Sequence, residues 1–197
     1  MYKFLISIFI AILFPLEVLS GQFGLEVGET KKSITNKGVI LKDDGSYWYY
    51  TNNLPKGNPK FNEYGLMIAP NSGLCKIVAY TDRIYTNSFG TELKSEFNFF
   101  ATALENKYGN NKKYDFLTLG SIWSDDNDWT MGLLKKERYL IYMWNKKFGS
   151  NLPSYINYLS VEANATRSEE GWIIVIYEFS NTDECFKERD ELQTQNL

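Results

Sequence analysis

The sequence predicts an α+β protein in which an antiparallel sheet predominates and one long helix packs across it. Short apolar runs alternate with turns rich in Gly, Asn and Asp, which is typical of antiparallel strands. One long stretch has the apolar spacing of a helix. Aromatic residues make up 16% of the chain, enough to fill a sizeable core.

Residues 1–20 have the pattern of a secretory signal peptide. Lys3 precedes an apolar run from Phe4 to Leu16, which is shorter than the roughly 18 to 20 residues that span a bilayer. Val18 and Ser20 suit a signal-peptidase site, so we expect cleavage after Ser20. The alternative is a buried core helix. We therefore expect a soluble secreted or periplasmic protein with no membrane span in its mature form.

The mature chain opens with a predicted short helix in GETKKSITNKG, residues 28–38. Thr30 is its expected N-cap, Ile34 faces inward, and Gly38 supplies the left-handed stop. A hairpin follows in VILKDDGSYWYY, where Asp-Asp-Gly separates two apolar runs.

Residues 54–65 are predicted to be a loop, because Pro55, Gly57 and Pro59 interrupt any strand ladder. Two further strands are expected on either side of the turn at residues 70–73.

The clearest element is a helix over TELKSEFNFFATALENKY, with Thr91 as its cap and Gly109 at its end. Its apolar residues recur at spacings of four, three, four and four, and form one stripe: Leu93, Phe97, Phe100, Leu104 and Tyr108.

The C-terminal part predicts three strands and a helix. RYLIYMW is one strand, and SYINYLSVEANA and GWIIVIYEF form a hairpin across TRSEEG. The run from Trp172 to Tyr177 is apolar at every position, so we expect a central strand covered on both faces. TDECFKERDELQ predicts a short closing helix, pinned by Cys185 and Phe186.

A weak internal repeat accompanies these elements. Phe23-Gly24 and Phe89-Gly90 each precede a helix, and about three strands follow each helix. The pattern indicates two α-β-β-β units, residues 21–88 and 89–197, sharing one core within a single mature domain of residues 21–197.

Two resemblances add to this reading. FGLEVGETKKSI…KG resembles the opening of the small BamE-like outer-membrane proteins, where a Gly-x-Thr cap starts a helix before a short antiparallel sheet. GLCKIVAY, LENKYG, GSIWSDDNDWTMGLLKKER and YEFSN are together similar to an uncharacterised group of bacterial secreted or periplasmic proteins. This implies a cell-envelope protein and assigns no site residues.

The composition excludes several chemistries. The chain has no histidine, so Ser-His-Asp and Cys-His mechanisms are absent, and a structural zinc site is implausible. No nucleophile motif or phosphate-binding glycine loop occurs. The net charge of −3 gives no footprint for nucleic acid. We expect no metal and no cofactor.

Cys75 and Cys185 are expected to pair as a disulfide in an oxidising compartment. Such a pair closes a loop of about 110 residues, for which chain entropy gives about 4 to 5 kcal/mol of stabilisation. The alternatives are two buried free thiols or a catalytic thiol.

The loop SIWSDDNDW carries Asp125, Asp126 and Asp128. The preferred interpretation is a polar turn in which Asp128 caps a helix over WTMGLLKKER. A calcium loop starting at Asp126 is the second, although Met131 stands where the turn glycine is required.

A third interpretation is a carboxylate-dependent hydrolase acting on glycan, with these aspartates, Glu162 and Glu178 as candidate catalytic residues. We instead expect a binding or structural protein of the envelope, without catalytic activity. Its partner would be an envelope protein or glycan, held by aromatic residues: Tyr47, Trp48, Tyr49, Tyr50, Trp123 and Trp129. For Tyr47 to Tyr50, whose side chains alternate between two faces, the favoured alternative is structural packing on both sides.

Overall fold

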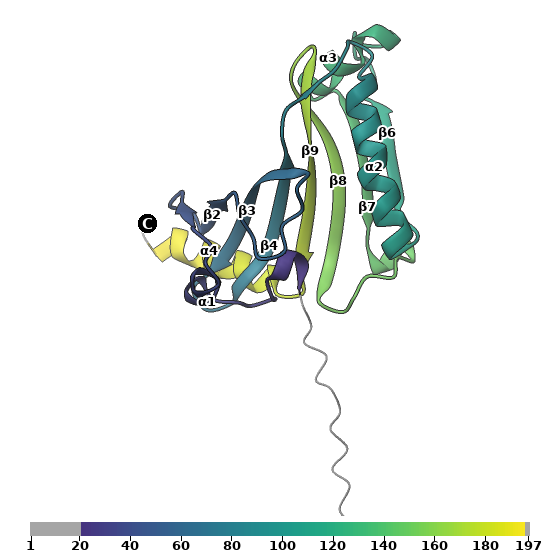
Figure 1. Ribbon diagram of the computed structural model, residues 1–197. Coiled ribbons are helices and arrows are strands. Elements are labelled where there is room, and N and C mark those ends of the chain that lie inside the picture. The colour runs from purple at the N-terminus through teal and green to yellow at the C-terminus, as the bar shows by residue number, and fades with distance from the viewer. Residues whose placement is uncertain (1–20, 196–197) are drawn as a thin grey trace, which may run out of the picture.

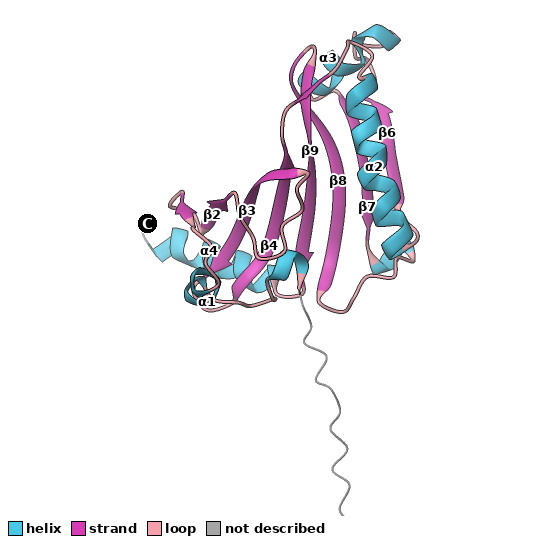
Figure 2. Ribbon diagram, viewed as in Figure 1, coloured by secondary structure: helices cyan, strands magenta, loops and turns pink. Residues whose placement is uncertain are grey.

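The structure is a computed structural model that describes residues 21–195, so the predicted signal peptide lies outside the described residues. Within them, nine strands form one antiparallel sheet (Figures 1 and 2). They are β1 (Lys42–Asp43), β2 (Trp48–Thr51), β3 (Phe61–Ala69), β4 (Gly73–Thr81), β5 (Ile84–Tyr85), β6 (Lys112–Leu117), β7 (Arg138–Trp144), β8 (Ile156–Arg167) and β9 (Glu170–Phe179).

The strand order is β1-β2-β3-β4-β9-β8-β7-β6, and β5 pairs with the end of β9. The helices are α1 (Lys31–Asn36), α2 (Thr91–Tyr108), α3 (Trp129–Leu134) and α4 (Thr182–Gln195), with short 3-10 turns η1 (Gln22–Gly24), η2 (Asp126–Asp128) and η3 (Lys146–Phe148). The predicted α+β class, dominated by antiparallel sheet and crossed by one longer helix, is confirmed. None of the helices in residues 21–195 is both long and apolar enough to cross a membrane.

Two meanders meet at the centre of the sheet. α1 is followed by β1 to β4 and α2 by β6 to β9, and the last strands of the two runs, β4 and β9, pair with each other. Figure 1 shows these two differently coloured strands side by side. The expectation of about three strands after each helix was too low, because five strands follow α1, with β5 the short last one, and four follow α2.

α1 forms as the sequence indicates. The Thr30 hydroxyl accepts a hydrogen bond from the Ser33 amide at 3.2 Å, Ile34 is fully buried, and Gly38 has a φ of +84°. The cap satisfies one of the amides that a helix start leaves without a partner.

The predicted loop over residues 54–65 is too long. β3 begins at Phe61, and Tyr64 pairs in register with Ala79 on β4. Both aromatic side chains are buried, so their packing against the core extends the strand towards Pro59.

α2 has the predicted bounds but not the predicted cap. Gly90, at φ +71°, is the N-cap, and Thr91 is the first helical residue, bonded through its amide and hydroxyl to the Asn87 side chain. A Cβ at residue 90 would lie 2.1 Å from the Trp129 ring, so this turn needs glycine for space as well as for its φ. Gly109 ends the helix as predicted.

One face of the sheet holds the main core. The buried stripe of α2 packs there against β8 and β9, together with α1 and α3. On the opposite face α4 packs on β3 and β4 through a smaller cluster of Met67, Ala69, Cys75 and Cys185, flanked by Trp48 and Phe186. The prediction that Cys185 and Phe186 hold the closing helix is confirmed. Cys75 and Cys185 lie at disulfide distance, with Cα atoms 6.5 Å apart.

The expectation that β9 is covered on both faces is wrong. β9 is central, and Ile173, Val175 and Tyr177 are buried in the main core. Its alternate residues, among them Ile174 and Ile176, are only half-buried, since α4 reaches β3 and β4 and does not cover this side of β9.

Candidate functional site

The uncovered side of the sheet is the most distinctive surface of the molecule. Because side chains alternate along a strand, the residues between the core positions of β2, β3, β4, β9, β8, β7 and β6 all point away from α2. We call this surface the open face; its central residues are Tyr80, Tyr158, Glu162, Ile174, Ile176 and Glu178.

The strand register arranges the open face in rows. In one row Glu63 lies opposite Tyr80, Tyr80 opposite Ile174, and Ile174 opposite Glu162. The same row continues through Ile141 to Tyr114 on the edge strand β6. Directly opposite side chains in a sheet lie roughly 5 Å apart and touch, so this row is one continuous band across six strands.

The next row repeats the apolar character. Val78 lies opposite Ile176, Ile176 opposite Ser160, and Ser160 opposite Met143. Val78 and Ser160 are buried by their neighbours, whereas Ile176 and Met143 are half-buried. Neither row has a helix above it between β9 and β6.

The apolar band reaches the β6–β7 end of the sheet. Phe116 and Tyr139 are 47% and 36% exposed, and their rings stack with centroids 5.1 Å apart. Beyond them, Leu119 and Ile122 in the following loop are 102% and 77% exposed. The stacked pair extends the apolar rows of the open face, and a contiguous apolar surface marks an interaction site more often than isolated surface residues do.

Three carboxylates lie within this apolar surface. The Glu178 carboxylate pairs with the Lys76 ammonium at 2.8 Å, and Glu162 accepts a hydrogen bond from the Ser160 hydroxyl at 2.8 Å. Glu63 has neither an ion pair nor a hydrogen bond through its carboxylate with any residue the structure describes.

The tyrosines beside these carboxylates are held neutral. Burial, followed by Tyr50 and Glu63, raises the pKa of Tyr80 to about 12. Burial, followed by the charges of Glu162 and Glu178, also raises the pKa of Tyr158. Both phenol groups therefore keep their protons at physiological pH, and the Tyr158 hydroxyl has a hydrogen bond with Ser160 that partly offsets the rise.

The Asp-rich loop is a helix start, and the helix is shorter than expected. η2 covers Asp126–Asp128 and α3 begins at Trp129, but α3 ends at Leu134. Lys136 has a φ of +57°, which a helix does not allow, and Arg138 is the first residue of β7. The last residues of the predicted helix therefore form a turn and the start of a strand.

The aspartates themselves do not converge. Asp125 and Asp126 are exposed, and the Asp128 side chain makes no capping hydrogen bond, contrary to the expectation that it caps α3. Across residues 21–195 no group of three or more His, Cys, Asp or Glu side chains is placed to hold a metal ion.

Glu162 and Glu178 share the open face but lie far apart along it. Glu178 pairs in register with Tyr158, four residues before Glu162 on β8. At about 3.4 Å per residue this separates the two backbones by roughly 14 Å. Glycoside hydrolysis needs two carboxyl groups roughly 5 to 9.5 Å apart, and Glu178 is already engaged by Lys76.

The aromatic residues singled out in the sequence are dispersed by strand alternation. Tyr49 packs on the main core, and Trp48 packs beside α4. Tyr47 occupies the turn before β2 at φ +66°, while Trp123 is half-buried in the loop before η2.

Trp129 is 4% exposed and lies beneath the Lys94 ammonium at 4.3 Å, so it is a core residue. Tyr50, by contrast, lies on the open face, opposite Gly65. Sequence reasoning missed Tyr80, Tyr158 and Tyr114, which no cluster of letters marks. One signal in the sequence did point to the open face. A strand with one face in water alternates apolar and polar residues, whereas β9 is apolar at successive positions.

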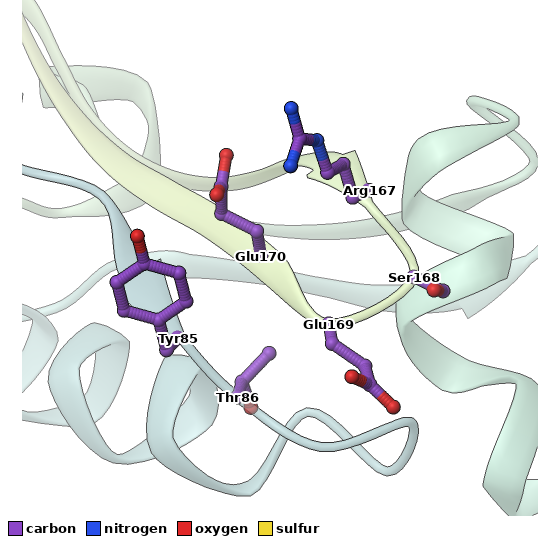
Figure 3. A pocket seen from close by; sticks show the side chains of 6 residues that line it. All are labelled: Tyr85, Thr86, Arg167, Ser168, Glu169 and Glu170. Atoms are coloured by element: carbon purple, nitrogen blue, oxygen red, sulfur yellow. The ribbon is translucent and has the colours of Figure 1, made fainter.

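A hollow at the tip of the β8–β9 hairpin is a weaker candidate for a binding site than the open face. Figure 3 shows its lining side chains, Tyr85, Thr86, Arg167, Ser168, Glu169 and Glu170. The carboxylate of Glu170 is buried, but the Thr166 hydroxyl bonds it at 2.6 Å and Arg83 lies 3.6 Å away. Its charge is thus satisfied by the protein itself, and the hollow is a structural feature of the hairpin.

The open face is therefore the candidate binding site, because packing within the protein does not account for its exposed apolar residues. Its apolar rows, uncovered strands and embedded carboxylates come from both meanders. Comparison of the chain with protein-family models, with curated proteins and with solved structures finds no match.

Proposed function

We propose that this is an exported protein of the cell envelope that binds a partner through the open face of its sheet. The observation that carries the proposal is the pair of half-exposed apolar rows on the side of β9 and β8 that no helix of residues 21–195 covers, exemplified by Ile174 and Ile176 on the central strand β9. Covering such a surface removes apolar area from water, at about 25 cal/mol for each Å².

Export is supported by two features. The first 20 residues have the signal pattern described above. The Cys75 and Cys185 side chains lie at disulfide distance, and disulfides persist in oxidising compartments.

A binding role has better support than catalysis. The chain has no histidine, and the open-face carboxylates Glu162 and Glu178 are too far apart along the sheet to act as a hydrolytic pair. Glycan hydrolysis remains the alternative activity, with Asp125, Asp126, Asp128, Glu162 and Glu178 as its residues.

Affinity capture with a matched pair of variants tests the proposal. The mature protein, residues 21–197, is immobilised and exposed to envelope extract, alongside an Ile174→Thr/Ile176→Thr variant and an Ile40→Thr control. Ile40 is 78% exposed and lies outside the open face. Threonine keeps the β-branched shape that strands favour, and circular dichroism checks that each variant is folded.

We expect a captured partner that the double variant loses and the Ile40→Thr control retains. Equal capture by all three proteins would contradict the proposal. Peptidoglycan or oligosaccharide hydrolysis abolished by one carboxylate substitution would replace it with the catalytic alternative.

A further inference from the structure

The open face carries an excess of negative charge at its centre. On β3, β4, β9 and β8 it presents the carboxylates of Glu63, Glu162 and Glu178 against the single ammonium of Lys76. The 2.8 Å pair neutralises Lys76 and Glu178, which leaves Glu63 and Glu162 without a cationic partner among residues 21–195. Two further lysines lie on the same face at its two edges, Lys112 on β6 and Lys42 on β1 opposite Tyr50, so the negative excess is confined to the centre.

The two unpaired carboxylates lie in one row. Glu63, Tyr80, Ile174 and Glu162 follow one another on four adjacent strands. Three strand spacings of about 4.8 Å place the two glutamates roughly 14 Å apart, with an aromatic ring and an aliphatic side chain between them. An extended peptide spans nearly the same distance between residues i and i+4.

The same face shows how its rings receive a cation. The Lys112 ammonium lies 5.0 Å from the centroid of the Tyr114 ring, within the range of a cation–π contact. Tyr80 and Tyr158 are half-buried on the same face, each beside carboxylates that add to the negative potential around the ring. A guanidinium or ammonium placed there would meet a ring below and a carboxylate beside it.

Anionic and uncharged partners fit this surface less well. A nucleic acid or acidic protein would bring like charge against Glu63 and Glu162. A neutral glycan would stack on the rings but leave both carboxylates without a counter-charge, and burying an unpaired charge costs free energy.

From this charge pattern we infer that the open face recognises a cationic protein segment in an extended conformation. Its basic side chains lie roughly 14 Å apart, over Glu63 and Glu162. The apolar side chain between them packs on Tyr80 and Ile174. The inference rests on the proposed binding function and specifies the chemistry of the partner.

The test uses defined peptides with blocked ends. The first is Arg-Ser-Val-Ser-Arg, with arginines at i and i+4 and a valine at i+2, on the same side of an extended chain. The second replaces each arginine by citrulline, which keeps the shape and loses the charge, and the third replaces each by glutamate. Binding to the mature protein is measured by titration, and the contacted residues are mapped by NMR chemical-shift changes.

Two double variants with the same change in net charge complete the design. Glu63→Gln/Glu162→Gln removes both unpaired carboxylates of the open face. Asp125→Asn/Asp126→Asn removes two exposed carboxylates at the start of α3, outside the open face.

We expect the arginine peptide to shift the resonances of Tyr80, Glu162 and Ile174, and to bind on the order of tenfold more tightly than the citrulline peptide. The glutamate peptide should not bind. The Glu63→Gln/Glu162→Gln variant should lose about tenfold in affinity, whereas Asp125→Asn/Asp126→Asn should bind as the wild type does.

Several results would overturn the inference. They are equal binding of the arginine and citrulline peptides, absence of arginine-peptide binding at millimolar concentration, equal losses in the two double variants, or specific binding of a neutral chito-oligosaccharide to the same residues. The proposed function is judged separately by partner capture with the Ile174→Thr/Ile176→Thr variant. If that variant loses the partner while Glu63→Gln/Glu162→Gln keeps it, the open face binds and its partner is not cationic.

Discussion

The two sides of β9 have nearly the same composition and opposite surroundings. Ile173, Val175 and Tyr177 are 0%, 1% and 6% exposed beneath α2, while Ile174 and Ile176, between them in the sequence, have no helix above them. The strand therefore supplies two apolar faces and the fold covers one. The difference shows that an apolar strand sequence indicates two faces that burial would stabilise, without indicating what buries each one. In the proposed function, a partner buries the second face.

The largest effect should come from the covered side. Phe97 is fully buried on α2 and packs edge-on against Tyr142, with ring centroids 5.0 Å apart. Phe97→Ala removes this packing and leaves a cavity, so we expect the free energy of unfolding to fall by about 3 to 5 kcal/mol. Urea denaturation followed by tryptophan fluorescence measures the loss. Phe116→Ala, on the exposed stacked pair, is the control and should lose much less.

The second effect concerns α4, which covers the other side of β3 and β4. If Cys75 and Cys185 form a disulfide, Cys75→Ser/Cys185→Ser should lower the free energy of unfolding by about 2 to 5 kcal/mol. Both side chains are fully buried, so the serine hydroxyls add to the loss. The wild-type protein unfolded with and without reductant provides the comparison. Two free thiols in a non-reducing peptide map of the native protein would show that the prediction is wrong.

A matched pair of substitutions tests the two sides of β9 directly. Val175→Thr places a hydroxyl in the covered core, and we expect a loss of about 1 to 3 kcal/mol in the free energy of unfolding. Ile174→Thr places the same group on the open face, where water can solvate it, so the loss should stay below about 1 kcal/mol. Equal losses, measured by thermal unfolding, would mean that the open face is as dry as the core.

The smallest expected effect is a pH dependence of the free energy of unfolding that arises from Glu188 on α4. Burial alone would raise the pKa of Glu188, but hydrogen bonds from Ser72 and Asn71 in the β3–β4 turn lower it on balance. A lowered pKa in the folded state means that this contribution is present above the pKa of the unfolded chain and is lost as the pH falls through the folded pKa. Stability should thus decline as the pH falls below the ordinary pKa of a glutamate, and Glu188→Gln should flatten part of that decline. An unchanged pH profile in the variant would contradict this role.

The elements that the sequence predicted well are those with one strong periodic signal. The stripe of α2 specifies its length and its buried face, and the β8–β9 hairpin follows from two apolar runs around a polar turn. β6 escaped prediction because its side chains are mostly exposed or half-buried, and the strand exists mainly through its pairing with β7. α3 was predicted too long because Arg138, read as its last turn, pairs with Leu117 in the sheet.

The open face was harder to predict for a related reason. The side chains of sequence neighbours such as Tyr49 and Tyr50 point to opposite sides of a strand. Residues that are clustered in the sequence are therefore on different surfaces of the protein. Conversely, Glu63, Tyr80 and Glu162 come from three strands and meet only through the sheet register. That register depends on pairing across the whole chain, which local patterns do not contain.

The junction between the two meanders also sets the order in which the chain can fold. Lys76 on β4 and its ion-pair partner Glu178 on β9 are 102 residues apart in sequence, and β9 is the last strand to be synthesised. Until it arrives, β4 has an unpaired backbone edge and the first meander cannot join the main sheet. Pairing over such a span is slow, because closing a long loop costs entropy before contacts repay it. The two meanders can therefore join only when almost all of the chain has been made.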